Sequence, residues 1–242
     1  IVIDNLSFEL TDAQKKVIFE IETDMENPIK MNRLIQGDVG SGKTVVAFIS
    51  VLKAFYSGYQ SAMMAPTEIL AKQHFESAVK LMGNILNVGI LTSSSTAKEK
   101  RDIIEKIQTG KIDFLIGTHA LIQENIKFLK LGLVITDEQH RFGVKQRAFL
   151  SSKGENPDTL VMTATPIPRT LALILYGDLD ISTIDELPPG RIPITTYVIN
   201  SSVEEKLIAF IKKQISEERQ VYIVCPLVEE SEKLNLVSAN EL

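Results

Sequence analysis

Short apolar runs without polar alternation recur along the first 162 residues of the chain, separated by stretches with helical spacing. A run of this kind is typical of a strand that is covered on both faces, as in a parallel sheet with helical crossovers. The pattern therefore predicts repeated β-α-β units, which form an α/β fold with a mostly parallel central sheet flanked by helices. The expected strands are residues 33–36, 61–65, 88–91, 114–116, 133–135 and 160–162.

Two of the stretches between these strands show clear helical periodicity. Apolar residues recur at helical spacing over 45–52 and over 103–107. Thr96 and Glu99 have the spacing of a capping box before the second helix, and Gly110 lies where that helix would end. The crossovers between the strands are therefore expected to be helices.

A proline-rich break at residues 186–193 divides the chain. It holds three prolines and one glycine in eight residues, which can continue neither a helix nor a central strand. Beyond it we expect strands at 195–199 and 220–225 with a helix at 203–215 between them, the opening of a unit too small to close its own core. The predicted organisation is a first domain at 1–187, a linker at 188–193 and the start of a second domain at 194–242.

The charge balance excludes a general affinity for polyanions. Lysine and arginine number 26 and aspartate and glutamate 31, a formal net charge of −5, so any contact with nucleic acid must be local. The single cysteine, Cys225, cannot form an internal disulfide, and His74, His119 and His140 lie too far apart to indicate a zinc cluster. These features favour an intracellular protein without a structural metal.

The start of the chain has no pattern of a secretory signal. Residues 1–10 include Asp4 and Glu9 and lack a basic start followed by an apolar stretch, and no apolar run approaches the length that crosses a bilayer. We therefore expect a cytoplasmic protein without a membrane partner. Because the chain begins with Ile1 instead of methionine, we also expect it to be a piece of a longer protein.

A glycine-rich segment, Gly-Asp-Val-Gly-Ser-Gly-Lys-Thr at 37–44, follows the first expected strand and opens a helix. This is the setting that the G-x-x-x-x-G-K-[ST] pattern requires, because the glycines let N–H groups point inward at a phosphate and the helix start adds a positive dipole end. Lys43 would bind the β and γ phosphates, and Thr44 would coordinate Mg²⁺. The alternative is a glycine-rich turn with a solvated lysine. The expected nucleotide-binding residues in this segment are Gly37, Gly40, Ser41, Gly42, Lys43 and Thr44.

An acidic pair, Asp137 and Glu138, follows another expected strand, where the second half of such a site belongs. Asp137 would hold Mg²⁺ through water, and Glu138 would polarise the attacking water. Lys43, Asp137 and Glu138 are therefore the expected catalytic residues, and Thr44 and Asp137 the expected metal ligands. The alternative is that both carboxylates simply start a solvated loop.

Five further segments make the sequence resemble the superfamily 2 helicases. They are 8–14, like the adenine-reading Q motif, 66–71, like motif Ia, 117–122, like motif Ic, 137–140, like motif II, and 163–170, like motif III. Extensions at 141–147, 176–180 and 187–191 point within this superfamily to the RecG branched-DNA helicases. Transcription-repair coupling translocases share Pro-Ile-Pro-Arg-Thr at 166–170, and they remain an alternative.

The resemblance implies a RecA-like P-loop NTPase lobe, the first motor lobe of an ATP-driven DNA helicase, followed by the truncated start of a second lobe. Such an enzyme remodels forks and Holliday junctions during recombination and repair, with ATP and Mg²⁺ as its cofactors. Gln14 would read adenine and so select ATP over GTP. Thr11 and Gln14 also have capping-box spacing, and the two interpretations are compatible.

The resemblance also implies residues that contact DNA. Thr67 follows Pro66 at a strand-to-helix turn, where a hydroxyl and free helix N–H groups can bind a DNA phosphate without adding net charge. Thr118 with His119 offers a second such point. Plain N-capping is the alternative for either threonine.

A further set of residues would couple hydrolysis to movement. Thr163 and Thr165 would hydrogen-bond the acidic segment and so link the presence of the γ phosphate to DNA binding. For His140, the alternative is an ordinary surface or core histidine. The expected coupling residues are Gln139, His140, Thr163, Thr165 and Arg169. The basic residues Arg141, Lys145 and Arg147 would contact DNA or the neighbouring domain. A solvated basic face is the alternative.

Part of the family's machinery is missing from the chain. The family places ATP between two lobes, and the second lobe supplies arginine fingers, which contribute about 10³–10⁵ in rate. After Val203 the only arginine is Arg219, and the family's upstream wedge domain is absent. We therefore expect the chain alone to bind nucleotide weakly and hydrolyse it poorly, and to require the remainder of its protein. A nucleotide-dependent switch without motor action is the competing hypothesis, which DNA-stimulated ATPase activity would exclude.

Overall fold

The computed structural model of this chain describes residues 9–138, 150, 153–165, 179–186, 194–200 and 203–224. The chain forms two compact units, Ile1–Arg191 and Ile192–Leu242, and each is described by itself. The exact division into two domains and a linker at 188–193 stays a prediction.

The first unit contains a seven-stranded sheet with the order β3-β4-β2-β5-β6-β1-β7, in which neighbouring strands run parallel. The strands are β1 Asn32–Gly37, β2 Gln60–Met64, β3 Val88–Leu91, β4 Phe114–Gly117, β5 Leu131–Thr136, β6 Asp158–Thr163 and β7 Asp180–Ile184. The predicted α/β fold with a parallel sheet is confirmed, and each of the six predicted strands is present. The edge strand β7 is an addition that the sequence pattern did not reveal.

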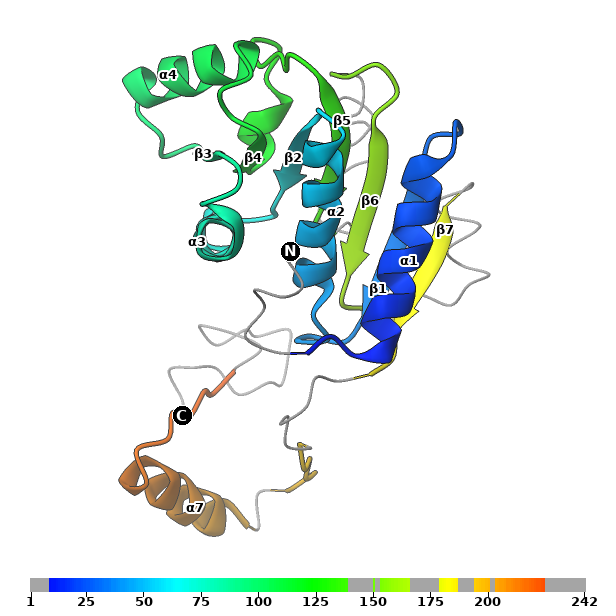
Figure 1. Cartoon of the computed structure of the whole chain (residues 1–242). Helices are drawn as coiled ribbons and strands as arrows, with labels where there is room; N and C mark the ends of the chain where they lie inside the picture. Colours follow the sequence, from blue (N-terminus) through cyan, green and yellow to red (C-terminus); the bar gives the residue numbers. More distant parts are fainter. Residues whose placement is uncertain are drawn as a thin grey trace, which may run out of the picture. The chain divides into compact units, whose positions relative to one another are not determined.

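Helices cover both faces of this sheet, and Figure 1 shows α1 and α2 in front of the strands. They are α1 Asp12–Glu26, α2 Lys43–Tyr56, α3 Glu68–Met82 and α4 Ala97–Gln108, with a short 3₁₀ helix, η2, at His119–Ile122. Helices α1, α2 and α3 share a large apolar core with one face of the sheet, and α4 and η2 share a smaller core with the other face. The predicted β-α-β crossovers are confirmed for α2, α3 and α4, which join β1 to β2, β2 to β3 and β3 to β4. The connection from β4 to β5 contains η2, and most of each connection on either side of β6 lies outside the described residues.

Side chains of β2, β4 and β5 alternate between these two cores, whereas Leu34 of β1 and Val161 of β6 lie in a third, smaller cluster with Leu179. In β4, Phe114 and Ile116 join the core beneath α2, whereas Leu115 joins the core beneath α4. Because successive strand residues point to opposite faces, a strand covered on both sides must be apolar at every position. This requirement explains why continuous apolar runs located the strands.

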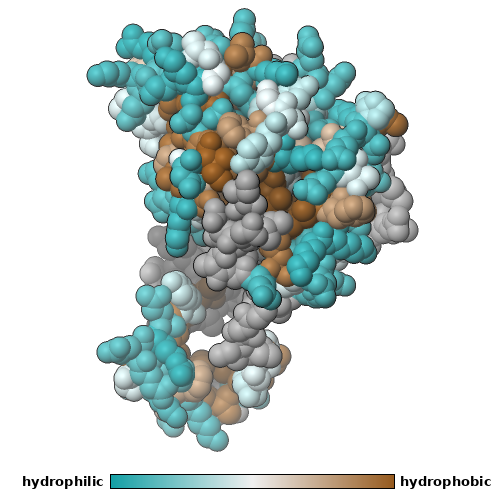
Figure 2. Space-filling model, in the orientation of Figure 1, coloured by the Kyte–Doolittle hydropathy of each residue, from teal (hydrophilic) through white to brown (hydrophobic). Residues whose placement is uncertain are grey.

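Capping boxes begin two of the helices. Thr96 and Glu99 form the predicted box at the start of α4, in which Glu99 Oε2 accepts from Thr96 N at 2.7 Å. Gly110 follows the helix with a φ of 70°, a left-handed conformation that ends helices readily. Figure 2 shows hydrophilic side chains over the outer surface of α4, in keeping with a helix that buries only a narrow apolar stripe.

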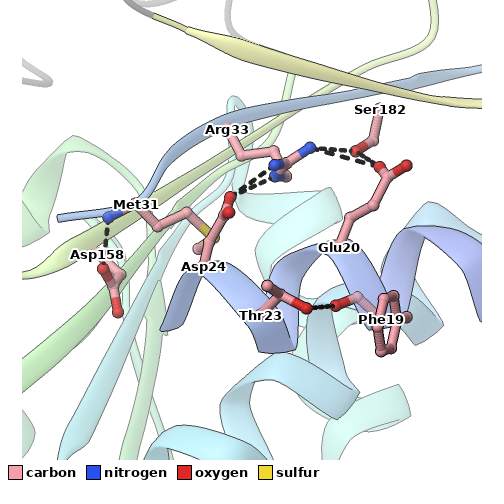
Figure 3. A network of polar contacts seen from close by, with 8 residues as sticks. All are labelled: Phe19, Glu20, Thr23, Asp24, Met31, Arg33, Asp158 and Ser182. Carbon is pink, nitrogen blue, oxygen red and sulfur yellow. Dashed lines mark hydrogen bonds and ion pairs between the residues drawn. The ribbon is translucent and has the colours of Figure 1, made fainter. Parts of the chain in front are cut away.

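A buried arginine ties the edge strand β7 to β1 and α1 (Figure 3). Arg33 Nε donates to Asp24 Oδ2 at 2.7 Å, and its Nη1 donates to Ser182 Oγ at 2.8 Å and Glu20 Oε2 at 3.4 Å. The Ser182 hydroxyl also bonds Glu20. An edge strand with a mostly exposed, alternating sequence is thus fixed by polar contacts as well as by its ladder with β1.

The second unit contains the predicted helix, α7 Glu204–Ser216, but not the strands expected beside it. Residues 194–200 and 219–224 have no regular secondary structure, so the strand predictions at 195–199 and 220–225 are wrong for the part that is described. Cys225 lies outside the described residues. The physical reason is that a strand needs a ladder partner, and here the β-branched and aromatic side chains that suggested strands, such as Val198 and Tyr222, are exposed.

None of the helices in the described part of the chain combines the length and apolar character that crossing a bilayer requires.

Candidate functional site

The loops that follow the parallel strands meet at one edge of the sheet. Strand β1 ends at Gly37 and β5 at Thr136, with β6 between them. Two strand spacings of roughly 4.8 Å separate β1 from β5, so their loops start about 10 Å apart. The phosphate-loop segment and the acidic pair therefore lie at the same carboxyl edge, within reach of a single ligand.

The glycines of segment 37–44 hold the loop in a shape that other residues cannot adopt. Gly40 and Gly42 have φ values of 78° and 87°, in the left-handed region. A Cβ atom on Gly42 would lie 2.2 Å from Gln14 Nε2, and one on Gly37 would lie 2.6 Å from Ser41 Oγ. The backbone therefore approaches its surroundings without intervening side chains, as a phosphate cradle requires.

Lys43 begins α2 and folds back over the loop. Its Nζ donates to Gly37 O at 2.7 Å and to Asp38 O at 2.9 Å. Burial lowers the pKa of the Lys43 ammonium, and the negative charges of Glu138 and Asp137 oppose this shift. The lysine thus lies within electrostatic reach of both carboxylates, as the position of the strand ends predicts.

A buried hydroxyl without a partner faces the same loop. Ser41 is fully buried, and its Oγ has no hydrogen-bond partner among the residues that the structure describes. Gly42, the N-cap of α2, has no side chain with which to cap the first N–H groups of the helix. Buried polar groups are normally paired, so these donors indicate a site built for a polar ligand.

The donor set at this edge fits a nucleotide with Mg²⁺. Hydroxyl, backbone N–H and ammonium groups suit the oxygens of a polyphosphate, and the Thr44 hydroxyl and the Asp137 carboxylate are hard oxygen ligands of the kind that Mg²⁺ prefers. The roles assigned to Thr44, Asp137 and the loop residues stay predictions.

Asp137 is buried and held from two directions. Its backbone N donates to Met64 O at 2.9 Å, which ties the end of β5 to the end of β2. Its Oδ2 lies 2.8 Å from His74 Nε2 on α3, a contact between two buried side chains. Asp137 is therefore a fixed carboxylate and not the start of a solvated loop.

Glu138 has an unusual backbone. Its φ is 50°, in the left-handed region that non-glycine residues avoid. Such a conformation costs about 1–3 kcal/mol and clusters at functional sites, although Asn156 and Glu218 adopt it in this chain too. The strain supports a functional position for Glu138, although its role in polarising water stays a prediction.

Gln14 forms the predicted capping box and also hydrogen-bonds the phosphate loop. Its Oε1 accepts from Thr11 N at 3.0 Å, and its backbone N donates to Thr11 Oγ1 at 3.3 Å. Its Nε2 donates to Ser41 O at 2.8 Å. The cap is therefore confirmed, whereas adenine recognition by Gln14 stays a prediction.

The predicted DNA-contact residues differ in accessibility. Thr67 is exposed and caps α3 by accepting from Leu70 N at 3.2 Å, with Pro66 half-buried beside it. Thr118 is only 1% exposed, and its hydroxyl has no partner among the described residues. Of that second pair, only His119 presents its side chain at the surface. Thr67 is therefore the better placed of the two threonines to meet an external phosphate.

The coupling residues are only partly described. Thr163 Oγ1 and Thr165 Oγ1 lie 2.9 Å apart and bond each other, and Thr165 N donates to Thr163 Oγ1. Six residues singled out from the sequence lie outside the described residues, namely Gln139, His140, Arg141, Lys145, Arg147 and Arg169.

Sequence reasoning missed two residues near the site. His74 belongs to the buried stripe of α3 with Ala71, Ala78 and Met82, so its helical spacing could have identified a histidine directed at the sheet. Glu186, at the end of β7, accepts from Ala13 N at 3.1 Å and so supports the start of α1. No local pattern indicates a contact between residues so far apart in the sequence.

The sequence that forms this site matches a known protein family. Residues 11–174 match the DEAD/DEAH box helicase family. The chain belongs to the DEAD/DEAH box helicase family. The matched range contains the whole phosphate loop and the acidic pair, and the sheet is the RecA-like lobe found in helicases of this family.

Within the DEAD/DEAH box helicases, the resemblance to RecG proteins is confirmed. An ATP-dependent DNA helicase RecG from Bacillus subtilis is 53% identical over 238 residues, which are 98% of this chain and 35% of the relative. RecG from Synechocystis is 53% identical over 239 residues, which are 98% of this chain and 29% of that relative. A solved structure of RecG bound to a three-way DNA junction matches with a TM-score of 0.80 and 46% identity, over 89% of this chain and 29% of that one. The chain thus spans about a third of the length of the curated relatives it matches.

Proposed function

We propose that this chain is the ATP-binding motor lobe of a DNA helicase that acts on branched DNA, such as forks and Holliday junctions, in recombination and repair. The observation that carries the proposal is the convergence of Lys43 with Asp137 and Glu138 beside a glycine cradle. The similarity to RecG helicases, whose solved relative holds a three-way DNA junction, supports the choice of DNA substrate.

In this proposal the residues of the carboxyl edge have different roles in ATP hydrolysis. The loop N–H groups, Ser41 and Lys43 bind the phosphates, which requires Lys43 to leave the carbonyl oxygens that it now contacts. Thr44 and Asp137 hold Mg²⁺, which when bound neutralises charge on the phosphate oxygens. Glu138 orients the attacking water, since in-line phosphoryl transfer depends on a positioned nucleophile more than on a strong base.

DNA binding is proposed for the exposed start of α3. Thr67 and the N-terminal N–H groups of that helix can hold a backbone phosphate, which agrees with a chain whose net charge is −5 and whose contacts with nucleic acid must be local. The remainder of the protein supplies the second lobe with its arginine fingers and the wedge that recognises the branch. We propose the bacterial cytoplasm as the place of action, because the relatives are bacterial DNA helicases.

The experiment is Glu138→Gln in the full-length protein. Because the amide keeps the size of the side chain but cannot polarise water as a carboxylate does, ATP binding should persist and DNA-stimulated hydrolysis should be abolished. Glu105→Gln, an exposed change on α4, is the matched control and should hydrolyse ATP normally.

Three outcomes separate the hypotheses. Unchanged turnover in Glu138→Gln would remove this residue from the mechanism. ATPase activity that DNA does not stimulate in the wild type would favour a nucleotide-dependent switch. A wild type that is stimulated by linear duplex as strongly as by forks and junctions would favour a translocase of the transcription-repair coupling kind.

A further inference from the structure

A buried hydrogen bond joins the acidic edge to helix α3. His74 Nε2 and Asp137 Oδ2 lie 2.8 Å apart, and the two residues are 7% and 9% exposed. An ionised carboxylate only accepts, so Nε2–H is the donor. The bond involves Oδ2 of Asp137, so the proposed metal contact is assigned to Oδ1.

Asp137 is anchored to the segment β2–α3 at two points. Its backbone N donates to Met64 O, the last residue of β2, and its side chain meets His74 in the helix that follows β2. A movement of α3 would therefore shift the carboxylate of Asp137 relative to the Asp137 backbone.

The same helix presents its start to solvent. Thr67 is the exposed N-cap of α3, and His74 lies seven residues further on. With a rise of 1.5 Å per residue, the two positions are about 10 Å apart along the helix axis, close to two turns. One rigid helix thus carries an exposed phosphate-binding end and a buried contact with the proposed metal ligand.

We propose that His74 is a positioning residue, which fixes the orientation of Asp137 for Mg²⁺ and transmits DNA binding at the start of α3 to that carboxylate. The inference rests on the proposed function. Hydrogen-bonded partners of metal ligands commonly contribute about 10–100-fold to metal affinity or activity. Because α3 carries both residues, the contribution of His74 to Mg²⁺ affinity depends on whether DNA is bound at Thr67.

Three variants of the full-length protein test the inference. His74→Gln keeps an N–H group at the reach of Nε2, whereas the amide of His74→Asn stops at the reach of Nδ1 and leaves Asp137 without its donor. Gln60→Leu is the control for lost stability, because Gln60 is buried at the opposite edge of the sheet and donates to Ile107 O and Ile112 O.

The primary measurement is the affinity for a fluorescent ATP analogue, with Mg²⁺ and in EDTA. His74→Asn should lose about 10–100-fold of the affinity that depends on Mg²⁺ and keep its affinity in EDTA. His74→Gln should restore most of the loss. Gln60→Leu should lower the Tm without changing the ratio of the two affinities. DNA stimulation of ATPase activity should fall in His74→Asn and recover in His74→Gln.

Each contrary result overturns the inference in a distinguishable way. If His74→Asn lowers the Tm but keeps the wild-type ratio of affinities, His74 is only a structural partner of Asp137. If the ratio falls but DNA stimulation survives, transmission through α3 is refuted. A wild type without Mg²⁺-dependent nucleotide binding would overturn the proposed function together with the inference.

Discussion

Polar side chains at the amino and carboxyl edges of the sheet differ in how they form hydrogen bonds. At the amino edge, Gln60 uses its side-chain amide fully, donating to Ile107 O and Ile112 O and accepting from Lys130 N. At the carboxyl edge, Ser41 Oγ is buried without a partner among the described residues, and Lys43 rests on loop carbonyl oxygens. Gln60 is thus satisfied within the protein, although Ser61 Oγ beside it is also buried without a partner among the described residues. At the carboxyl edge the unpartnered hydroxyl lies in the same loop as the Lys43 ammonium group, which makes both donors available to a ligand.

The comparison separates stability from chemistry. Changes at the amino edge should alter the free energy of unfolding and leave nucleotide binding alone, because they break contacts within the protein. Changes at the carboxyl edge should do the reverse. A variant that changes both the free energy of unfolding and nucleotide binding would contradict this division.

The largest expected effect is that of Lys43→Met on ATP hydrolysis. Loss of a cationic donor to a transferring phosphoryl group costs about 10²–10³ in rate. Stability should hardly change, because burial already disfavours the ammonium, whose pKa is lowered. ATPase rates and thermal unfolding of the full-length protein provide the measurement.

Lys153→Met is the matched control for this variant. Lys153 also donates to two backbone carbonyls, Gln123 O at 2.6 Å and Ile126 O at 2.9 Å, and burial also lowers its pKa. It lies away from the acidic pair, so its loss should leave the ATPase rate unchanged. Equal losses of rate in both lysine variants would show that holding loop carbonyls, and not phosphate, is what matters.

The second effect in size is that of Arg33→Met on stability. Breaking a buried ion pair costs about 3–5 kcal/mol, but Glu20 and Asp24 keep 30% and 22% of their side-chain surface, so we expect about 2–3 kcal/mol. Urea unfolding measures the loss, and nucleotide affinity of the folded protein should stay unchanged.

The control for Arg33 is an exposed ion pair. Lys106→Met breaks the contact of Lys106 with Asp102 on α4, which lies 2.7 Å away in solvent and should cost below about 0.5 kcal/mol. A weaker affinity for nucleotide in Arg33→Met would contradict the separation of the two edges, since it would mean that β7 and α1 help to shape the phosphate loop.

The sequence predicts most of the central sheet because burial on both faces leaves a continuous apolar run. The strand β7 escaped this pattern, since at the sheet edge its side chains alternate and only Ser182 and Ile184 are buried. Strands predicted at 195–199 and 220–225 failed for the complementary reason. Their apolar composition fits a strand, but a ladder depends on a partner that composition cannot supply.

The candidate site also has parts that the sequence predicts and parts that it does not. The phosphate loop was predictable because its chemistry lies in eight consecutive residues, 37–44, with glycines where the backbone is left-handed. The bond between His74 and Asp137 joins residues 63 apart in sequence, and it depends on how α3 packs on the sheet. Local patterns thus predict the parts of a site, and tertiary packing decides how they are joined.

The smallest expected effect is that of Asp158→Asn on stability. Asp158 lies at the start of β6, where its Oδ1 accepts from Met31 N at 2.8 Å, and an asparagine oxygen can accept the same bond. Burial raises the pKa of the Asp158 carboxyl above its ordinary value. The native state therefore holds this proton to higher pH than the unfolded chain, and the carboxylate disfavours the native state once it is ionised.

The pH dependence gives the sign of this effect. Below the ordinary carboxyl pKa of 3.8, Asp158 is protonated in both states, so variant and wild type should be equally stable. As the pH rises through the raised native pKa, the wild type loses stability relative to Asp158→Asn, and above it the variant should be more stable by about 0.5 kcal/mol. Urea unfolding across this range isolates the difference, since all other groups titrate alike in both proteins. A difference that does not change with pH would mean that charge at Asp158 is already fully compensated, and that even this partly buried carboxylate belongs to the internally satisfied edge.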